Sequence, residues 1–237
     1  MFGWRARVGL IVPATNAVNA PEWRDHLPEG VSLHTARMSQ PPGADIAALD
    51  EMVTNYEGAA ERLGQAEVDV VAFGCTTGSL FKGYGYETEI ETTMQEAADV
   101  PAVATSGSIQ RAFEALGVES LAVVTPYIEE LNEKEREFLT DAGFTVTQID
   151  GLGIEEAIDI GKRPADESYR HARGLEPIDA DALFISCTAY RTFEHIRYLE
   201  HDLDVPVVSS NQATLWDTLR TVGVDYSDIE LGRLFEE

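Results

Sequence analysis

The chain has 237 residues, of which 44% are hydrophobic, so it can bury a large core in one domain or in two domains of about 110 residues each. Its 42 acidic residues outnumber 17 basic ones and give a formal net charge of −25, which argues against nucleic acid and anionic membrane surfaces as partners. Only three of the basic residues are lysines, and an acidic, lysine-poor surface is typical of a halophilic protein.

The N-terminus enters its first apolar run, Val8–Val12, without the apolar segment and small-residue cleavage site of a signal peptide. No apolar stretch reaches the ~18 residues of a membrane helix, so we expect a cytoplasmic protein that does not bind membranes. In a reducing compartment the only two cysteines, Cys75 and Cys187, are expected to be free thiols. Apart from His195 and His201 on one helix flank, the five histidines show no metal-ligand spacing, so we expect no metal site.

Apolar runs of strand length alternate with helical patterns along the whole chain. The pattern predicts strands at Val8–Val12, Val31–Met38, Val68–Phe73, Pro101–Thr105, Leu121–Val124, Thr145–Ile149, Ala182–Ile185 and Val205–Val208. It predicts helices at Ala20–His26, Ala44–Gln65, Glu87–Ala98, Ser108–Leu116, Ile128–Ala142, Ala165–Arg173, Thr192–Glu200 and Ala213–Val222. Such alternation predicts an α/β fold with parallel sheets flanked by helices.

The second half of the chain repeats the first. The proline after the first strand of each half, Pro13 and Pro126, recurs after 113 residues, and the two cysteines are 112 residues apart. We therefore expect two α/β lobes related by pseudo-twofold symmetry: residues 1–106 with a returning C-terminal helix in 211–237, and residues 107–210. A ligand site then falls between the lobes, where the carboxyl ends of both sheets face one another, and each lobe contributes one cysteine.

Each cysteine ends a buried strand and is followed by a threonine, in Gly74–Gly78 and Ser186–Thr188. Together with the motifs Pro13–Asn16, Val124–Tyr127 and Val208–Trp216, this order resembles the maleate cis-trans isomerase and arylmalonate decarboxylase branch of the aspartate/glutamate racemase superfamily. The resemblance spans nearly the whole chain. It implies a two-lobed enzyme that works without a cofactor and whose site lies between the lobes.

The same resemblance implies that the helix after each lobe's last strand packs on the other lobe, here Ser108–Leu116 and Ala213–Val222. Arylmalonate decarboxylases keep only the second-lobe cysteine, whereas maleate isomerases keep both, as this chain does. One departure is that maleate isomerases are expected to offer an asparagine in the loop Gly151–Gly161. No asparagine occurs between Asn132 and Asn211, which leaves one expected carboxylate contact unexplained.

A nucleophilic cysteine needs a local positive potential, because a free thiol with a pKa of about 8.5 is mostly protonated at neutral pH. Neither cysteine has a basic residue within three positions, so the expected source is the N-terminus of the helix or turn that follows each strand. At least one thiol is then expected to react faster than a model thiol. In so acidic a protein, neutral donors at strand ends are expected to hold a substrate carboxylate; the predicted substrate-binding residues are Pro13, Asn16, Thr76, Thr77, Tyr127 and Thr188.

The resemblance implies that Cys75 and Cys187 are catalytic, with Cys75 adding to the double bond of a maleate-like C4 dicarboxylate and Cys187 acting on the neighbouring carbon. One alternative is a racemase or an arylmalonate-type decarboxylase that uses cysteine as proton donor. Another alternative is a non-catalytic protein that binds small carboxylates. The expected partner is a small carboxylate or dicarboxylate substrate, and a homo-oligomer is left open.

Each candidate also has a structural interpretation. Either cysteine could be a small buried hydrophobe, Asn16 could cap the turn after the first strand, and Tyr127 could be a core aromatic residue. The pair Asn211–Gln212 is interpreted as a cap of the last helix. The glycine-rich stretch Gly83–Tyr86 lacks the spacing of a phosphate-binding loop and is interpreted as a flap near Cys75.

Overall fold

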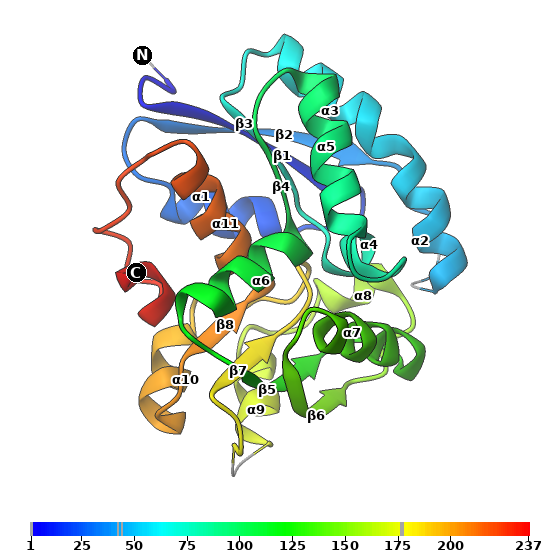
Figure 1. Cartoon of the computed structure of the whole chain (residues 1–237), viewed down its shortest axis with the longest axis vertical. Coiled ribbons are helices and arrows are strands. Elements are labelled where there is room, and N and C mark those ends of the chain that lie inside the picture. The colour runs from blue at the N-terminus through cyan, green and yellow to red at the C-terminus, as the bar shows by residue number, and fades with distance from the viewer. Residues whose placement is uncertain (1, 42, 44, 176–177) are drawn as a thin grey trace.

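The chain forms two parallel sheets flanked by helices (Figure 1), in a computed structural model that describes residues 2–41, 43, 45–175 and 178–237. The elements of the first half are β1 (Ala6–Pro13), α1 (Asn19–His26), β2 (Val31–Met38), α2 (Ile46–Met52), the 3-10 turn η1 (Val53–Asn55), α3 (Tyr56–Gln65), β3 (Val70–Phe73), α4 (Thr76–Leu80), α5 (Tyr86–Ala98), β4 (Ala102–Ala104) and α6 (Thr105–Ala115). Those of the second half are β5 (Ser120–Thr125), α7 (Glu129–Asp141), β6 (Thr145–Gly151), α8 (Ala157–Ile160), α9 (Asp166–Arg173), β7 (Ala182–Ile185), α10 (Ile196–Leu203), β8 (Val207–Ser209), α11 (Ser210–Thr221) and η2 (Arg233–Glu236).

The two sheets have equivalent topologies. Their strand orders are β2-β1-β3-β4 and β6-β5-β7-β8, and all the strand pairs described are parallel. The central strands β3 and β7 are buried at every residue, as expected for parallel strands covered by helices on both faces. The predicted α/β fold with two similar sheets is confirmed.

The predicted continuous helix Ala44–Gln65 is wrong, because it divides into α2, η1 and α3. Its proposed first residue, Ala44, lies outside the described residues. At the break the Thr54 hydroxyl donates to the carbonyl of Glu51, and this local bond competes with regular helix geometry. The helices α4 and α8 were not predicted, because each is too short to show a helical period of apolar residues.

The helix predicted at Thr192–Glu200 begins later, at Ile196. Its first residues are held in turns by a side chain from far along the sequence: the carboxylate of Glu22 accepts the backbone N–H groups of Thr192 and Phe193. A contact between residues so far apart in sequence cannot be seen in the local spacing of apolar residues. Here this tertiary contact overrides the helical pattern.

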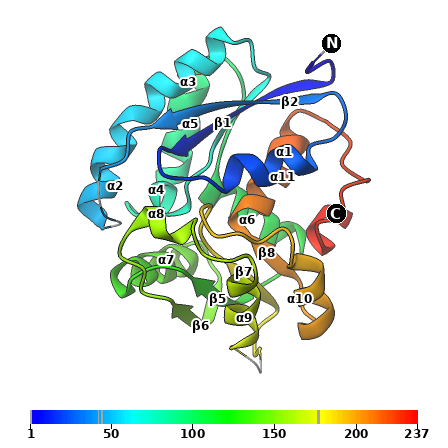
Figure 2. The same cartoon turned by 180° about the vertical axis from the view of Figure 1, so that it is seen from behind.

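The helices that follow the last strands, α6 and α11, pack on each other between the two sheets (Figures 1 and 2). Each also contacts the sheet of the other half, α6 at β8 and α11 at β3 and β4. The Ser108 hydroxyl of α6 donates to Asp217 of α11 over 2.8 Å. The division of the chain at residues 106 and 210 stays a prediction.

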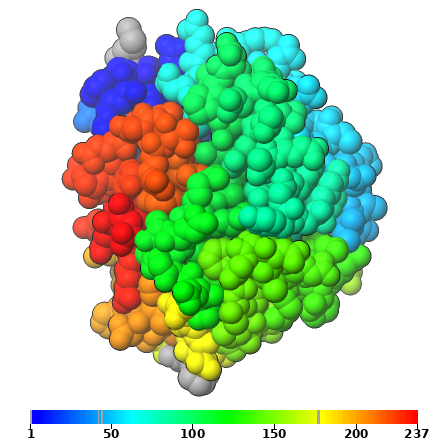
Figure 3. Space-filling view, viewed as in Figure 1, coloured from blue at the N-terminus to red at the C-terminus, as the bar shows by residue number. Residues whose placement is uncertain are grey.

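The C-terminal segment, orange and red in Figure 3, lies against the blue N-terminal part of the surface. One contact there is the guanidinium of Arg5, which donates to the carbonyl of Asp225 over 3.4 Å. Among the described residues there is no helix with the length and apolar character needed to cross a bilayer.

Candidate active site

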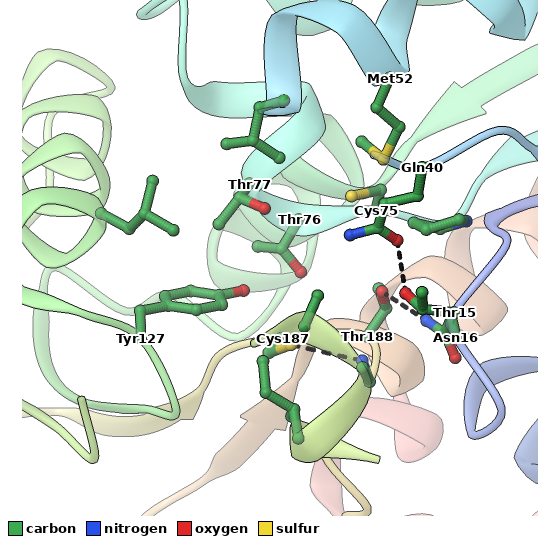
Figure 4. A pocket seen from close by; sticks show the side chains of 16 residues that line it. Thr15, Asn16, Gln40, Met52, Cys75, Thr76, Thr77, Tyr127, Cys187 and Thr188 are labelled. Atoms are coloured by element: carbon green, nitrogen blue, oxygen red, sulfur yellow. Dashed lines mark hydrogen bonds between the residues drawn. The ribbon is translucent and has the colours of Figure 1, made fainter. Parts of the chain in front are cut away.

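The carboxyl ends of four central strands converge on one cavity (Figure 4). β1 leads to Asn16, β3 to Cys75, β5 to Tyr127 and β7 to Cys187. In each sheet the first and third strands are adjacent and their following helices diverge, so a crevice opens at their carboxyl ends. The cavity together with the open solvent at its mouth has about 490 Å³ of space not filled by protein atoms.

All the residues predicted from sequence to form the site line this cavity: Pro13, Asn16, Cys75, Thr76, Thr77, Tyr127, Cys187 and Thr188. Sequence reasoning missed the other lining residues, which are Thr15, Gln40, Leu49, Met52, Leu131, Ala157, Ile160 and Ala189. Thr15 lies within the motif Pro13–Asn16 and Ala189 directly follows Ser186–Thr188, so their place in the lining could have been predicted from these motifs. The apolar ones carried no signal, because a leucine that lines a cavity and one that fills a core give the same helical pattern.

One wall of the cavity is apolar where a polar contact was expected. α8 lies in the loop Gly151–Gly161 and places Ala157 and Ile160 in the lining. Leu49 and Met52 of α2 add to this apolar surface. The loop that lacks the expected asparagine therefore contributes apolar side chains to the lining.

The Cys75 thiol is buried, with 6% of the residue exposed, at the N-terminus of α4. Burial raises its pKa to about 11, and the Gly78 amide and the Thr77 hydroxyl oppose this effect only in part. α4 has one and a half turns, so its dipole is weak. The raised pKa gives no support to the expectation that a thiol of this site reacts faster than a model thiol, which stays a prediction.

Cys187 is also buried, with 8% exposed, and its backbone has φ = +93°, a conformation that side chains rarely adopt. Burial raises the pKa of its thiol to about 12, although the Tyr127 hydroxyl and the Ala189 N–H both hydrogen-bond to the sulfur. Both cysteines are free thiols, as predicted. The pKa is raised because desolvation outweighs these hydrogen bonds.

Asn16 has both of the positions that the sequence left open, a cap after the first strand and a place in the lining of the cavity. Its Oδ1 accepts the backbone N–H groups of Val18 and Asn19 and so caps the start of α1, while its Nδ2 donates to Oγ1 of Thr188 over 3.1 Å. The Thr188 hydroxyl in turn donates to the carbonyl of Gly74. Asn16 is thus both a cap and part of the cavity lining, and it connects the two halves.

A second link between the halves runs through Ser210, the first residue of α11. Its hydroxyl oxygen accepts from the Thr76 hydroxyl at 2.9 Å and from the backbone N–H of Cys187 at 3.1 Å. This bond helps hold Cys187 in its unusual backbone conformation. The Ser210 hydroxyl therefore joins the two cysteine-bearing loops.

The remaining interpretations from sequence are partly corrected. The last helix has a capping box made by Ser209 and Gln212, whereas Asn211 bonds to Glu22 and to the Thr188 carbonyl. Gly83–Tyr86 connects α4 to α5 and does not line the cavity. Among the described histidine, cysteine and acidic side chains, no group of three or more is placed to hold a metal ion.

Comparison with known proteins decides the family, because the model of the family described as arylmalonate decarboxylase matches residues 8–235. The chain belongs to this family. The arylmalonate decarboxylase of Bordetella bronchiseptica is 30% identical over 240 residues, which cover 97% of this chain and 96% of the relative. The maleate isomerase of Geobacillus stearothermophilus is 24% identical over 232 residues, 92% of each chain.

Among solved structures, a cysteine-to-serine mutant of Nocardia farcinica maleate cis-trans isomerase with a covalently bound succinylcysteine intermediate has a TM-score of 0.91 at 23% identity. The match covers 97% of this chain and 98% of the other. At this identity the likeness shows the fold. As a member of the arylmalonate decarboxylase family with relatives of both activities, the protein is an enzyme, as predicted.

Proposed function

We propose that the protein is a cofactor-independent cis-trans isomerase of a maleate-like C4 dicarboxylate and that Cys75 forms a covalent adduct with the substrate. The observation that supports this most is the position of the two thiols: equivalent strands of the two sheets bring Cys75 and Cys187 to one cavity, on different sides of it (Figure 4). A decarboxylase that protonates one face of an enediolate needs one thiol, whereas two thiols suit an addition–elimination pathway or a racemase with one thiol on each face.

Neutral donors are available for the substrate carboxylates. Among the described residues that line the cavity there is no lysine or arginine, and the hydroxyl-bearing side chains are Thr15, Thr76, Thr77, Tyr127 and Thr188. Asn16 keeps a second amide hydrogen beyond the one that it donates to Thr188. In a buried site such hydrogen bonds stabilise the charge that develops as the sulfur adds.

The proposed reaction balances as follows. The Cys75 sulfur forms a bond to one olefinic carbon as its own proton passes to the medium, and the electron pair of the double bond moves into an enediolate. The S–H bond of Cys187 then breaks as a C–H bond forms on the neighbouring carbon. Rotation about the new single bond follows, and elimination reverses both steps to give the trans isomer.

The raised thiol pKa values fit these roles. A thiol with a pKa of about 12 is protonated at neutral pH, as a proton donor must be, so Cys187 suits protonation of the carbon. The pKa of Cys75, about 11, means that its proton leaves as the C–S bond forms rather than beforehand.

A second candidate function is favoured by the apolar wall of Leu49, Met52, Ala157 and Ile160. A decarboxylase or racemase acting on a carboxylate with an apolar substituent would place that substituent against this wall, and a thiol would protonate the α-carbon. This reading uses the same cavity and the same thiols with a different substrate.

The test compares wild type with Cys75→Ser and Cys187→Ser. We expect the wild type to convert maleate to fumarate, Cys75→Ser to lose activity without an adduct, and Cys187→Ser to accumulate a protein mass increase of one substrate. Near-wild-type turnover by Cys75→Ser would reject the isomerase proposal. Release of carbon dioxide from an arylmalonate, or exchange of the α-proton of aspartate, with maleate untouched would favour the second candidate.

A further inference from the structure

A buried carboxyl group lies behind the Cys187 side of the cavity and has no role in the chemistry above. Glu135 of α7 has no exposed surface, and its Oε1 accepts a hydrogen bond of 2.6 Å from the Ser186 hydroxyl. Its Oε2 has no hydrogen-bond partner among the described residues. A carboxylate in such surroundings is costly, so its presence calls for an explanation.

Ser186 connects this carboxyl group to the cavity. Its hydroxyl lies 3.4 Å from the Tyr127 hydroxyl, which hydrogen-bonds to the sulfur of Cys187. A serine hydroxyl has one hydrogen and cannot donate to Glu135 and Tyr127 together. When Glu135 is ionised, the Ser186 hydroxyl donates to it. When Glu135 is protonated, it can donate to Ser186, Ser186 to Tyr127 and Tyr127 to the sulfur of Cys187. This hydrogen-bond chain therefore has a proton-binding group at each end, Glu135 and Cys187, joined by two hydroxyl groups.

We propose that Glu135 exchanges a proton with Cys187 through Ser186 and Tyr127, so that the negative charge left when Cys187 protonates the substrate moves to Glu135. The inference rests on the proposed function, in which Cys187 is the proton donor. Glu135 touches neither the substrate nor the reacting sulfur and acts through the two hydroxyl groups as a positioning residue.

The transfer conserves bonds and charge. After Cys187 has given its proton to carbon, the O–H bond of Tyr127 breaks as a new S–H bond forms. Tyr127 then receives the hydroxyl proton of Ser186, and Ser186 receives the carboxyl proton of Glu135. Both hydroxyl groups end as they began and a carboxylate remains at Glu135. The reverse transfer restores the Cys187 thiolate before elimination.

The direction of transfer follows from burial. Burial raises the pKa of Cys187 to about 12 and that of Glu135 to about 8, so the sulfur binds a proton more tightly than the carboxylate does. Moving the charge also takes it away from the two carboxylates of the bound substrate, which reduces like-charge repulsion in a site of low dielectric.

The other groups that face Glu135 leave this exchange undisturbed. Of the elements that pack against α7, α4 contains no charged residue, and the only acidic residue of β6, Asp150, bonds to His171. Glu135 itself acts electrostatically on Tyr127 and Cys187, the two members of the chain nearest the cavity.

The test needs no substrate and uses Cys75→Ser, in which Cys187 is the only thiol. Alkylation of Cys187 by iodoacetamide is followed against pH. We expect an inflection in the alkylation rate near pH 8, where Glu135 ionises and the Ser186 hydroxyl turns from donating to Tyr127 to donating to Glu135. Adding Glu135→Gln, which keeps the side-chain volume, or Ser186→Ala should remove the inflection. Adding Glu133→Gln, an exposed residue of the same helix, should leave it in place.

A second measurement separates this inference from the proposed function. With the Cys75 thiol intact, Glu135→Gln should lower kcat for maleate about 10-fold or more with little change in KM. An inflection that persists in the Glu135→Gln protein, or wild-type kcat in that variant, overturns the proton exchange and leaves the isomerase proposal standing. If the alkylation profile is as expected but the wild type does not convert maleate, the proton exchange is supported and maleate is rejected as the substrate.

Discussion

The side-chain amide of Asn16 and the hydroxyl of Thr188 form a hydrogen bond of 3.1 Å that joins the two halves of the cavity. The same amide caps α1 through its oxygen, which accepts from Val18 and Asn19. One side chain therefore has a structural role and a position from which it can donate to a ligand. A suitable substitution can separate the two.

We expect Asn16→Asp to keep the cap, because a carboxylate accepts the same two N–H groups, and to weaken substrate binding, because a negative charge replaces a donor. KM should rise about 10-fold or more, with the melting temperature nearly unchanged. Asn16→Ala is the control and should also lose about 1 kcal/mol of stability with the cap. A wild-type KM in Asn16→Asp would remove Asn16 from the carboxylate site.

The apolar wall predicts a change of substrate preference. Ala157→Asn places an amide in the loop where the sequence lacks one, so we expect kcat/KM to rise for maleate and to fall for carboxylates with apolar substituents. Ile158→Asn is the matched control, because Ile158 lies in the same helix α8 and is exposed. Steady-state kinetics with both substrate types measures the ratio. An equal effect of the two variants would mean that residue 157 does not face the substrate.

The strained backbone at Cys187 predicts an unusual order of stability. Glycine normally costs about 0.5–1 kcal/mol relative to alanine in regular structure, but it adopts φ near +93° without a steric penalty. We therefore expect Cys187→Gly to unfold at a higher denaturant concentration than Cys187→Ala, with both variants inactive. The usual order, with alanine more stable, would show that the conformation is not strained.

The buried thiols predict slow alkylation. Because the pKa values of Cys75 and Cys187 are raised to about 11 and about 12, little thiolate is present at neutral pH, and native protein should react with iodoacetamide more slowly than a small model thiol does. Two thiols should become reactive on unfolding without reductant. Fast alkylation of either cysteine in the native protein would contradict the raised values.

Two buried carboxyl groups predict how stability depends on pH. Burial raises the pKa of Glu135 from 4.5 to about 8 and that of Glu22 from 4.5 to about 7. The folded chain therefore binds more protons than the unfolded chain between these values, and the free energy of unfolding should fall as pH rises from about 4.5 to about 8.

Denaturant unfolding at constant high salt measures this slope. Glu135→Gln should flatten it, because glutamine does not titrate, and the control Glu133→Gln should leave it as in the wild type. A slope that is unchanged in Glu135→Gln would show that Glu135 is ionised in the folded protein at neutral pH.

The sequence by itself determined the parallel α/β sheets, their repetition and the positions of Cys75 and Cys187 at strand ends. These features follow from local periodicity and from short motifs, which the chain displays without reference to its fold. Tertiary structure alone decided the rest. The thiol pKa values depend on burial, the apolar wall depends on which helices face the cavity, and the link from Cys187 to Glu135 joins residues 52 positions apart. Desolvation and long-range contact arise only when distant segments pack, so neither can be read from a local pattern.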